Sequence, residues 1–137
     1  MPGDRRTLYS VINSSSAPFF LAMILAPRSR FTRALVGRAS PLFIALGLAY
    51  DVLLASGASQ QGKMIDFRDP EAVRAALAEP DAFLAGWTHY IAFDLFVGRW
   101  IWQDALDRGK TARVALLLTW MAGPAGLSLY LLGRRAR

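Results

Sequence analysis

The sequence contains no cysteine and a single histidine, His89. The absence of thiols excludes disulfides, thiolate catalysis and cysteine-ligated metal sites, and one histidine cannot build a histidine-rich metal site. A carboxylate site for a hard cation remains conceivable, but no spacing of acidic residues supports it. We therefore predict neither a metal nor a cofactor.

Charge is also scarce in this chain. Charged residues make up 19% of the sequence and apolar residues 54%, with a mean hydropathy of +0.29. Soluble domains normally carry about 25% charged residues. The charges also gather between apolar runs, which is typical of helices in lipid. The length of 137 residues is enough for one domain, 1–137.

Acidic residues are outnumbered by basic ones, which gives a net charge of +6. Basic residues stand at the ends of apolar segments, at Arg28, Arg30, Arg33, Arg38, Arg134, Arg135 and Arg137. That placement fits anionic headgroups and topology signals. No nucleic-acid-binding motif accompanies it. We predict a membrane as a partner and no nucleic acid.

Four apolar segments are predicted to be membrane-spanning helices, over residues 8–26, 41–57, 82–106 and 112–132. A span takes about 20 apolar residues, and no alternating strand pattern is present. The expected fold is therefore all-α, an integral membrane four-helix bundle. Four crossings would place both termini on one side, and near-equal numbers of basic residues on the two sides leave the orientation open.

The first apolar segment has a rival interpretation as a signal peptide. Arg5 and Arg6 would form its basic end and residues 17–26 its apolar core. Pro27 and Arg28 follow at once, and no small-x-small cleavage site is evident. These features favour a retained helix.

The connecting segments carry their own signals. Asp69, Pro70 and Glu71 form a good helix start within the long polar stretch 57–81, so a short surface helix is expected there. The connection 107–111 is tight, which makes the third and fourth helices antiparallel neighbours. Pro124, between Gly123 and Gly126, is expected to kink the fourth helix.

The third segment holds an aspartate, Asp94, at its middle. A charge at that depth costs at least about 2.5–3.5 kcal/mol, so it should face the interior of the bundle. Tyr90 lies about 40° from Asp94, one turn away, and Trp87 shares that side. Arg99 lies about 140° round the helix, so Asp94 should find its partner on another helix.

Asp51 is a second acid within an apolar segment. It and Arg99 would form a cross-helix ion pair, and Asn13 would supply a neutral partner from the first helix. With His89 and Asp94 they form a candidate polar cluster. Two other interpretations stay open: such a pair can serve only to fix helix register, and His89, like the nearby tryptophans, can belong to an interfacial aromatic belt.

Two motifs in the second half of the chain resemble those of a known family. Residues 87–101 read W-x-H-Y-x-A-F-D-L-F-x-G-R-W-I, and residues 123–130 read G-P-x-G-L-x-x-Y. They resemble the neoxanthin-synthase-like family, which is named for a plant abscisic-acid-deficiency locus. With the regions around Asn13 and Tyr50, the resemblance spans most of the chain.

The resemblance implies a four-helix membrane protein of carotenoid or xanthophyll metabolism. The plant member is implicated in isomerising the epoxide violaxanthin to the allene neoxanthin. In that reaction an acid protonates the epoxide oxygen and a base removes a vinylic proton. By this logic Asp94 would be the acid, His89 the base, and Arg99 would stabilise developing oxyanion charge. The substrate-binding residues would be Tyr90, Trp87, Asp51 and Asn13.

Three functions compete at this point. The first is an isomerase acting on a carotenoid or another isoprenoid lipid, which we expect in a bacterial inner membrane. The second is a non-catalytic membrane subunit that binds pigment, either as a homo-oligomer or as the scaffold of a larger complex. A small transporter ranks last, because four helices are few and no inverted repeat is present.

Overall fold

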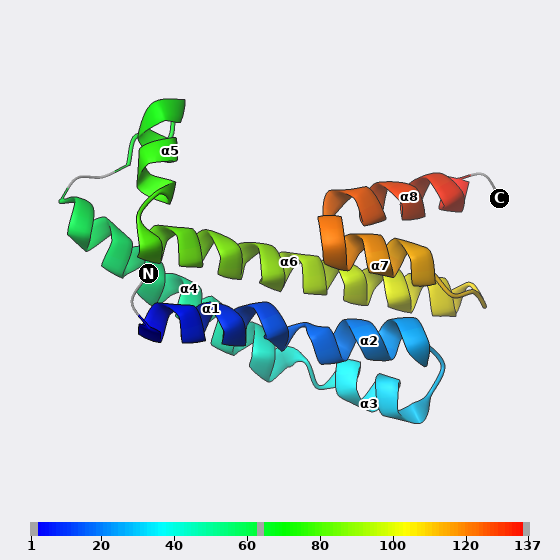
Figure 1. The fold of residues 1–137 in the computed structure, drawn as a ribbon. Helices are drawn as coiled ribbons and strands as arrows, with labels where there is room; N and C mark the ends of the chain where they lie inside the picture. Colours follow the sequence, from blue (N-terminus) through cyan, green and yellow to red (C-terminus); the bar gives the residue numbers. More distant parts are fainter. Residues whose placement is uncertain (1–2, 63–64, 136–137) are drawn as a thin grey trace.

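The computed structural model describes residues 3–62 and 65–135, and all regular structure in these ranges is α-helical. This confirms the all-α prediction. The longest helix, α6 (Pro80–Asp107), lies at the centre, and other helices pack along it (Figure 1). The remaining helices are α1 (Gly3–Ser15), α2 (Ala17–Leu25), α3 (Arg30–Gly37), α4 (Ser40–Gln61), α5 (Pro70–Leu77), α7 (Arg113–Ala122) and α8 (Pro124–Arg135).

The first apolar segment forms two helices, α1 and α2, that run nearly end to end (Figure 1). The break falls at Ser16, because Pro18 has no N–H to continue the hydrogen-bond ladder. Together they cover Gly3–Leu25, which is long and apolar enough to cross a membrane by length and composition. Arg30–Ser59, covering α3 and most of α4, is the second such segment in the described residues.

Helix α3 lies between the first two apolar segments, where no helix is predicted from the sequence. The Ser29 side chain accepts a hydrogen bond from the Thr32 backbone N–H at 3.0 Å and so caps the helix. Thr32 and Val36 are buried, while the arginines of this segment point outward. The run of arginines concealed this amphipathic pattern.

Helices α4 and α6 pack antiparallel in a regular register. A side chain on Gly57 would meet Ala82 Cβ at 3.4 Å. The Tyr50 and His89 ring centroids are 6.0 Å apart, as are those of Phe43 and Phe96. From one of these contacts to the next, the chain moves seven residues back along α4 and seven residues forward along α6. A seven-residue spacing is the repeat of coiled-coil packing. This register fixes which residues of the two helices can meet.

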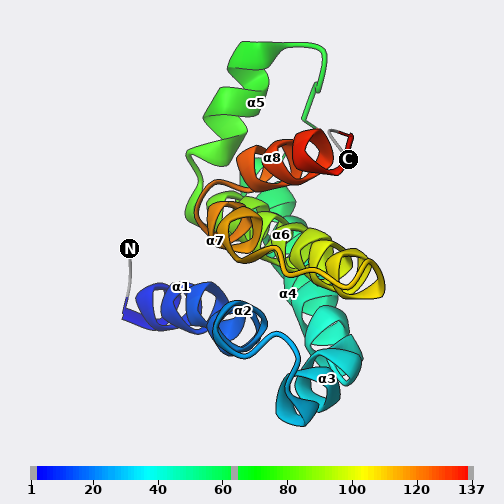
Figure 2. The same ribbon diagram turned by 90° about the vertical axis from the view of Figure 1, so that its right-hand side faces the viewer.

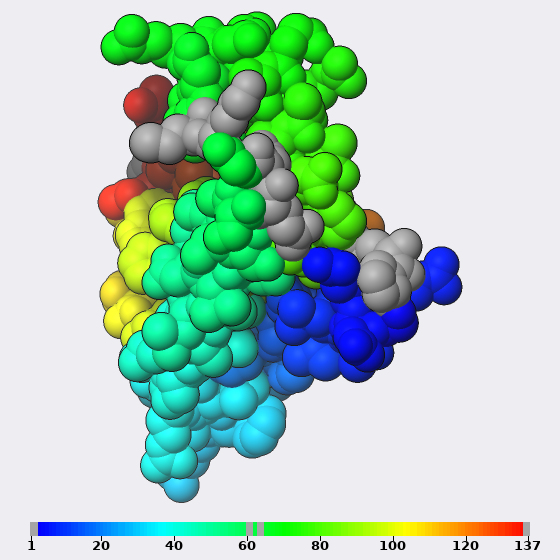
Figure 3. Space-filling view, turned by 90° about the vertical axis from the view of Figure 1, so that its left-hand side faces the viewer, coloured from blue at the N-terminus to red at the C-terminus, as the bar shows by residue number. Residues whose placement is uncertain are grey.

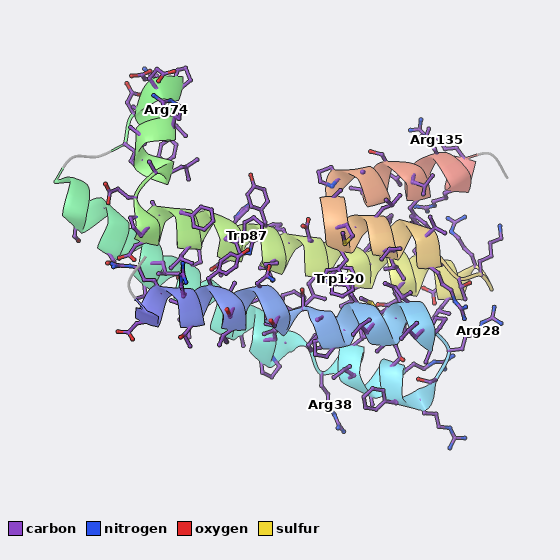
Figure 4. All side chains as sticks on the ribbon, viewed as in Figure 1. Arg28, Arg38, Arg74, Trp87, Trp120 and Arg135 are labelled. Atoms are coloured by element: carbon purple, nitrogen blue, oxygen red, sulfur yellow. The ribbon has the colours of Figure 1, made fainter. Side chains whose placement is uncertain are left out.

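Helix α5 stands away from the other helices at one end of the molecule (Figures 1 and 3). It begins where the sequence predicts, because the Asp69 side chain accepts from the Glu71 N–H at 3.0 Å and Pro70 occupies the first turn. Arg74 lies near its outer tip (Figure 4).

The segment 112–132 does not form one kinked helix. At Gly123, with a positive φ of 39°, the chain turns back, and α8 packs along α7 (Figures 1 and 2). Gly126 makes this possible, since a Cβ there would overlap the backbone of Thr119. The predicted kink is thus a complete reversal, and the two chain ends lie at opposite ends of the molecule (Figure 1).

Two apolar clusters hold the helices to α6. The larger one centres on Phe20, which is fully buried and stacks on Trp120 with ring centroids 5.8 Å apart. Phe20 also packs so closely on Gly98 that an added Cβ would lie 2.6 Å from its ring. The smaller cluster contains Ile12, Leu46, Leu53, Leu84 and Ala85.

Candidate functional site

A groove of about 780 Å³ lies between α4 and α6. Its volume is in the range of small-molecule sites. Most of its walls are apolar or aromatic, with Phe43, Ile44, Leu46, Phe93 and Phe96 among them. Its ionisable residues are Tyr50, Asp51, His89 and Arg99. An elongated apolar molecule with a polar end group would match this lining.

Three of the residues singled out in the sequence thus line one groove: Asp51, His89 and Arg99. The His89 ring is held between aromatic neighbours. It stacks on Phe93, with ring centroids 4.5 Å apart and an angle of 26° between the planes, and lies 6.0 Å from Tyr50. These contacts orient the imidazole towards α4.

The expected Asp51–Arg99 ion pair is not formed among the described residues. The α4–α6 register places Asp51 level with Thr88 and Arg99 level with Ser40. Arg99 follows Thr88 by eleven residues, which is roughly 17 Å along the helix at 1.5 Å per residue. Asp51 and His89 therefore lie towards one end of the groove and Arg99 at the other.

Asp94 lies on the opposite face of α6. It is roughly 160° round the helix from the groove residues Ala92 and Phe96. Its carboxylate faces Gly123 instead, where an added Cβ would lie 2.7 Å from Oδ1. Helix α8 begins at the next residue, and its first N–H groups have no partner within the helix. A carboxylate beside a helix start is electrostatically favourable, so Asp94 supports the chain reversal.

Trp87 and Asn13 meet on a third face of α6. The Trp87 indole N–H donates to the Asn13 side-chain oxygen at 3.2 Å, which links α6 to α1. Tyr9 and Phe83 complete an aromatic cluster around this bond, with ring centroids 5.7 and 6.0 Å from Trp87. Tyr90 lies beside Trp87 but is 62% exposed. None of these residues lines the α4–α6 groove.

An ion pair that the sequence does not predict joins three helices. Asp81, 5% exposed, accepts hydrogen bonds from Arg5 Nε at 2.5 Å and Nη2 at 3.0 Å, and from the Ser56 hydroxyl at 2.7 Å. The sequence indicates only that Arg5 is the basic end of the first apolar segment and that Asp81 belongs to the polar stretch 57–81. No local pattern connects residues so distant in sequence.

A second missed cluster joins α6 to α8. The Tyr130 hydroxyl donates to Asp104 Oδ2 at 2.5 Å, and Arg108 Nε donates to the same oxygen at 2.9 Å. Arg134 approaches Asp104 Oδ1 at 3.6 Å and covers the Trp100 ring at 5.8 Å. The spacing of Asp104 to Arg108 and of Tyr130 to Arg134 is a helical i,i+4 signal in each case.

The chemistry available in the groove is that of an acid and a base beside an apolar surface. Asp51 and His89 are both suited to proton transfer, and Arg99 offers fixed positive charge. Within the ranges that the structure describes, no three His, Asp or Glu side chains gather to hold a metal ion.

Comparison with known proteins identifies relatives of the chain. A family model described as ABA DEFICIENT 4-like matches residues 7–130. The chain is also similar to Protein ABA DEFICIENT 4, chloroplastic, of Arabidopsis thaliana, at 23% identity over 127 residues. That alignment covers 88% of this chain and 57% of the relative, so the chain spans little more than half of the relative's length. No solved structure matches.

These findings overturn one prediction and confirm another. The relative is named as chloroplastic, which contradicts the expected bacterial inner membrane. That expectation was wrong because apolar helices indicate lipid without distinguishing one membrane from another. The family resemblance is confirmed, since the matching region contains both motifs, 87–101 and 123–130. The chain belongs to the ABA DEFICIENT 4-like family.

Proposed function

We propose that the chain is a membrane-embedded protein of carotenoid or isoprenoid metabolism. In this proposal the α4–α6 groove binds an elongated polyene lipid, and its side chains isomerise an epoxide end group. The family resemblance supports the substrate class. The observation that carries the proposal is the groove itself, which is mostly apolar but holds Asp51, His89 and Arg99.

The surface of the helices supports membrane embedding. Within the candidate spans Gly3–Leu25 and Arg30–Ser59, the apolar stretch of 18 residues is only 22% and 17% buried, respectively. The core helix of a soluble protein would be mostly covered. On α4 the exposed side chains Ile44, Leu48 and Val52 follow one another at four-residue spacing and form an apolar stripe. Hydrocarbon is a suitable neighbour for such a stripe.

Helix α6 serves as a third crossing in this arrangement, and its central Asp94 faces the α7–α8 turn. The hairpin of α7 and α8 would enter and leave the membrane on one side. Its helices have 10 and 12 residues, or roughly 15–18 Å each, about half of a 30 Å hydrocarbon core. Non-helical backbone at such depth is tolerated where protein buries it. Gly123 is buried at the turn, against Asp94.

In this proposal the proton-transfer roles differ from those that the family resemblance implies. His89 would remove the vinylic proton, and the electron pair of the broken carbon–hydrogen bond would form the allene. Asp51 would protonate the epoxide oxygen as the carbon–oxygen bond breaks, leaving a hydroxyl group. Return of the proton from His89 to Asp51 completes an isomerisation with no net change in atoms. Asp94 faces away from the groove, so in this proposal it positions α8 instead.

The test is turnover of violaxanthin by the full chain in lipid nanodiscs, with the products separated by chromatography. We expect His89→Ala and Asp51→Asn each to lower the rate by roughly 100-fold or more. Pigment binding, measured by the absorbance shift, should persist. Asp94→Asn is the matched control and should retain turnover if the fold is intact by circular dichroism. Wild-type turnover in both groove variants would contradict the mechanism.

A second candidate function is a non-catalytic subunit that binds pigment. It is favoured by the exposure of both Asp51 and His89, because enzymes that use proton transfer usually enclose these groups. This candidate predicts tight pigment binding without conversion, and co-purification of a partner at fixed stoichiometry. Conversion of violaxanthin by the purified chain would exclude it.

A further inference from the structure

A second cavity, of about 500 Å³, opens between the α6–α7 loop and α8. Four basic side chains contribute to its lining: Arg108, Lys110, Arg113 and Arg134. We propose that this cavity binds a phosphate group, carried either by an anionic lipid headgroup or by a soluble phosphate. The cavity lies outside the α4–α6 groove and has no role in the proposed isomerisation.

The charges of the cavity are only partly neutralised. Arg108 and Arg134 share a single carboxylate, Asp104, at 2.9 and 3.6 Å. Among the described residues no carboxylate forms an ion pair with Lys110 or Arg113. An anion would therefore meet two side chains whose charge is not already paired, in addition to the Asp104 cluster.

The backbone around the cavity favours an anion as well. Helix α7 starts at Arg113, and its N-cap residue, Ala112, has no side chain that could accept a hydrogen bond. The residues of its first turn, including Val114 and Ala115, line the cavity. Helix starts leave N–H groups without intrahelical partners, and these groups and the basic side chains would act on the same ligand.

The loop that carries these residues is held in place. The Arg28 side chain donates to the Gly109 carbonyl at 2.8 Å, and the Lys110 N–H donates to the Ala105 carbonyl at 2.8 Å. Gly109 has a φ of 70°, which permits the tight turn between these two bonds. The cavity is therefore formed before any ligand arrives, and less ordering opposes binding.

The position of the cavity suits a headgroup. Arg28 and Arg135 lie at the same end of the molecule, where α2 and α8 end (Figure 4). The lining also contains Val114 and Leu129, apolar residues that could follow an acyl chain away from the phosphate. Binding of a lipid headgroup depends on the proposed membrane embedding, whereas binding of a soluble phosphate does not.

The experiment measures ligand binding to the full chain in mild detergent by titration calorimetry. The probes are short-chain phosphatidylglycerol, short-chain phosphatidylcholine and inorganic phosphate. The test variant is Lys110→Gln with Arg113→Gln. Its control is Arg30→Gln with Arg38→Gln, which removes the same charge from exposed positions outside this cavity.

We expect phosphatidylglycerol to bind in preference to phosphatidylcholine. The test variant should bind it roughly 30-fold more weakly, given the attraction of each basic residue for anionic lipid, and the control less than threefold. If inorganic phosphate binds as tightly as phosphatidylglycerol, the ligand is a soluble phosphate. If inorganic phosphate does not bind, the ligand is a lipid headgroup. No preference for the anionic lipid, or equal losses in both variants, would overturn the proposal. Pigment binding by the test variant is measured as well. It should be unchanged, because the groove of the proposed function lies elsewhere, so the two proposals can fail independently.

Discussion

At two glycines the fold depends on the absence of a Cβ atom. Gly123 and Gly126 allow the chain to reverse between α7 and α8, and Asp94 lies against the reversal. A charge at the middle of a helix in lipid is costly, so the sequence predicts that Asp94 faces protein. Its packing gives a local reason for an acid at this position: the carboxylate lies against Gly123, directly before the start of α8, which an apolar residue would not stabilise.

Gly126→Ala is expected to destabilise the protein. The new methyl group would overlap the Thr119 backbone and the Ala115 carbonyl, so α7 and α8 would have to separate. Overpacking of this kind costs roughly 1–3 kcal/mol. Thermal unfolding in mild detergent measures the loss. Gly133→Ala in α8 is the control, because nothing lies within 4 Å of a Cβ there; equal stability of the two variants would contradict the close packing.

Asp81→Asn is expected to loosen α1 from α4 and α6. The substitution removes the carboxylate that accepts from Arg5 and from Ser56. Ser56→Ala deletes one of these bonds and should lower the free energy of unfolding by about 1 kcal/mol, with a larger fall for Asp81→Asn. Glu71→Gln, which removes the exposed ion pair with Arg74, is the control and should change little. A similar effect in all three would argue against a special role for Asp81.

At the scale of elements, the α4–α6 register determines which chemical groups meet. It separates Asp51 from Arg99 along the groove and brings His89 level with Tyr50, the neighbour of Asp51 in the chain. The sequence shows which residues of α6 share a face, but not how far α4 slides along it. A shift of one heptad would leave the apolar contacts similar and change every polar pair.

Cysteine cross-linking tests this register. Because the chain has no native cysteine, only the introduced cysteines can form a disulfide. Gly57→Cys with Ala82→Cys places the two Cβ atoms 3.4 Å apart, close to the separation that a disulfide requires. We expect cross-linking under mild oxidation, detected as a mass loss of two hydrogens. The pair Asp51→Cys with Arg99→Cys should remain reduced. Efficient cross-linking of that second pair would show that the register is wrong.

At the scale of the whole molecule, the excess of basic over acidic residues lies at one end. Basic residues collect around the α6–α7 loop and the end of α8: Lys110, Arg113 and Arg134 line one cavity there, and Arg28 bonds to the loop at Gly109. Arg28 and Arg135 lie at this same end (Figure 4). The opposite end, near α5, carries the acids Asp66, Asp69, Glu71, Glu79 and Asp81. If the chain spans the membrane as proposed, the basic end should lie on the side from which the protein is inserted, because loops rich in Lys and Arg are not translocated.

Side-specific labelling tests this topology. Lys110→Cys and Arg135→Cys should react with a membrane-impermeant maleimide from the same side of sealed vesicles, and Arg74→Cys from the other. An α7–α8 hairpin that enters and leaves on one side requires this result. Labelling of Arg135→Cys and Arg74→Cys from one side would restore the four-crossing topology expected from the sequence, since four crossings place the C-terminus with the α5 loop.

The apolar runs, the Asp69 cap and the two family motifs were enough, by themselves, to establish helical structure, the start of α5 and the family. These are local properties, set by side-chain hydrophobicity, backbone propensity and residue order. Only the tertiary structure decided that Gly123 reverses the chain, that Asp94 faces the reversal, and that Asp81 meets Arg5. Each of these depends on packing between segments distant in sequence, where a few tenths of an ångström at a glycine determine how closely two helices approach.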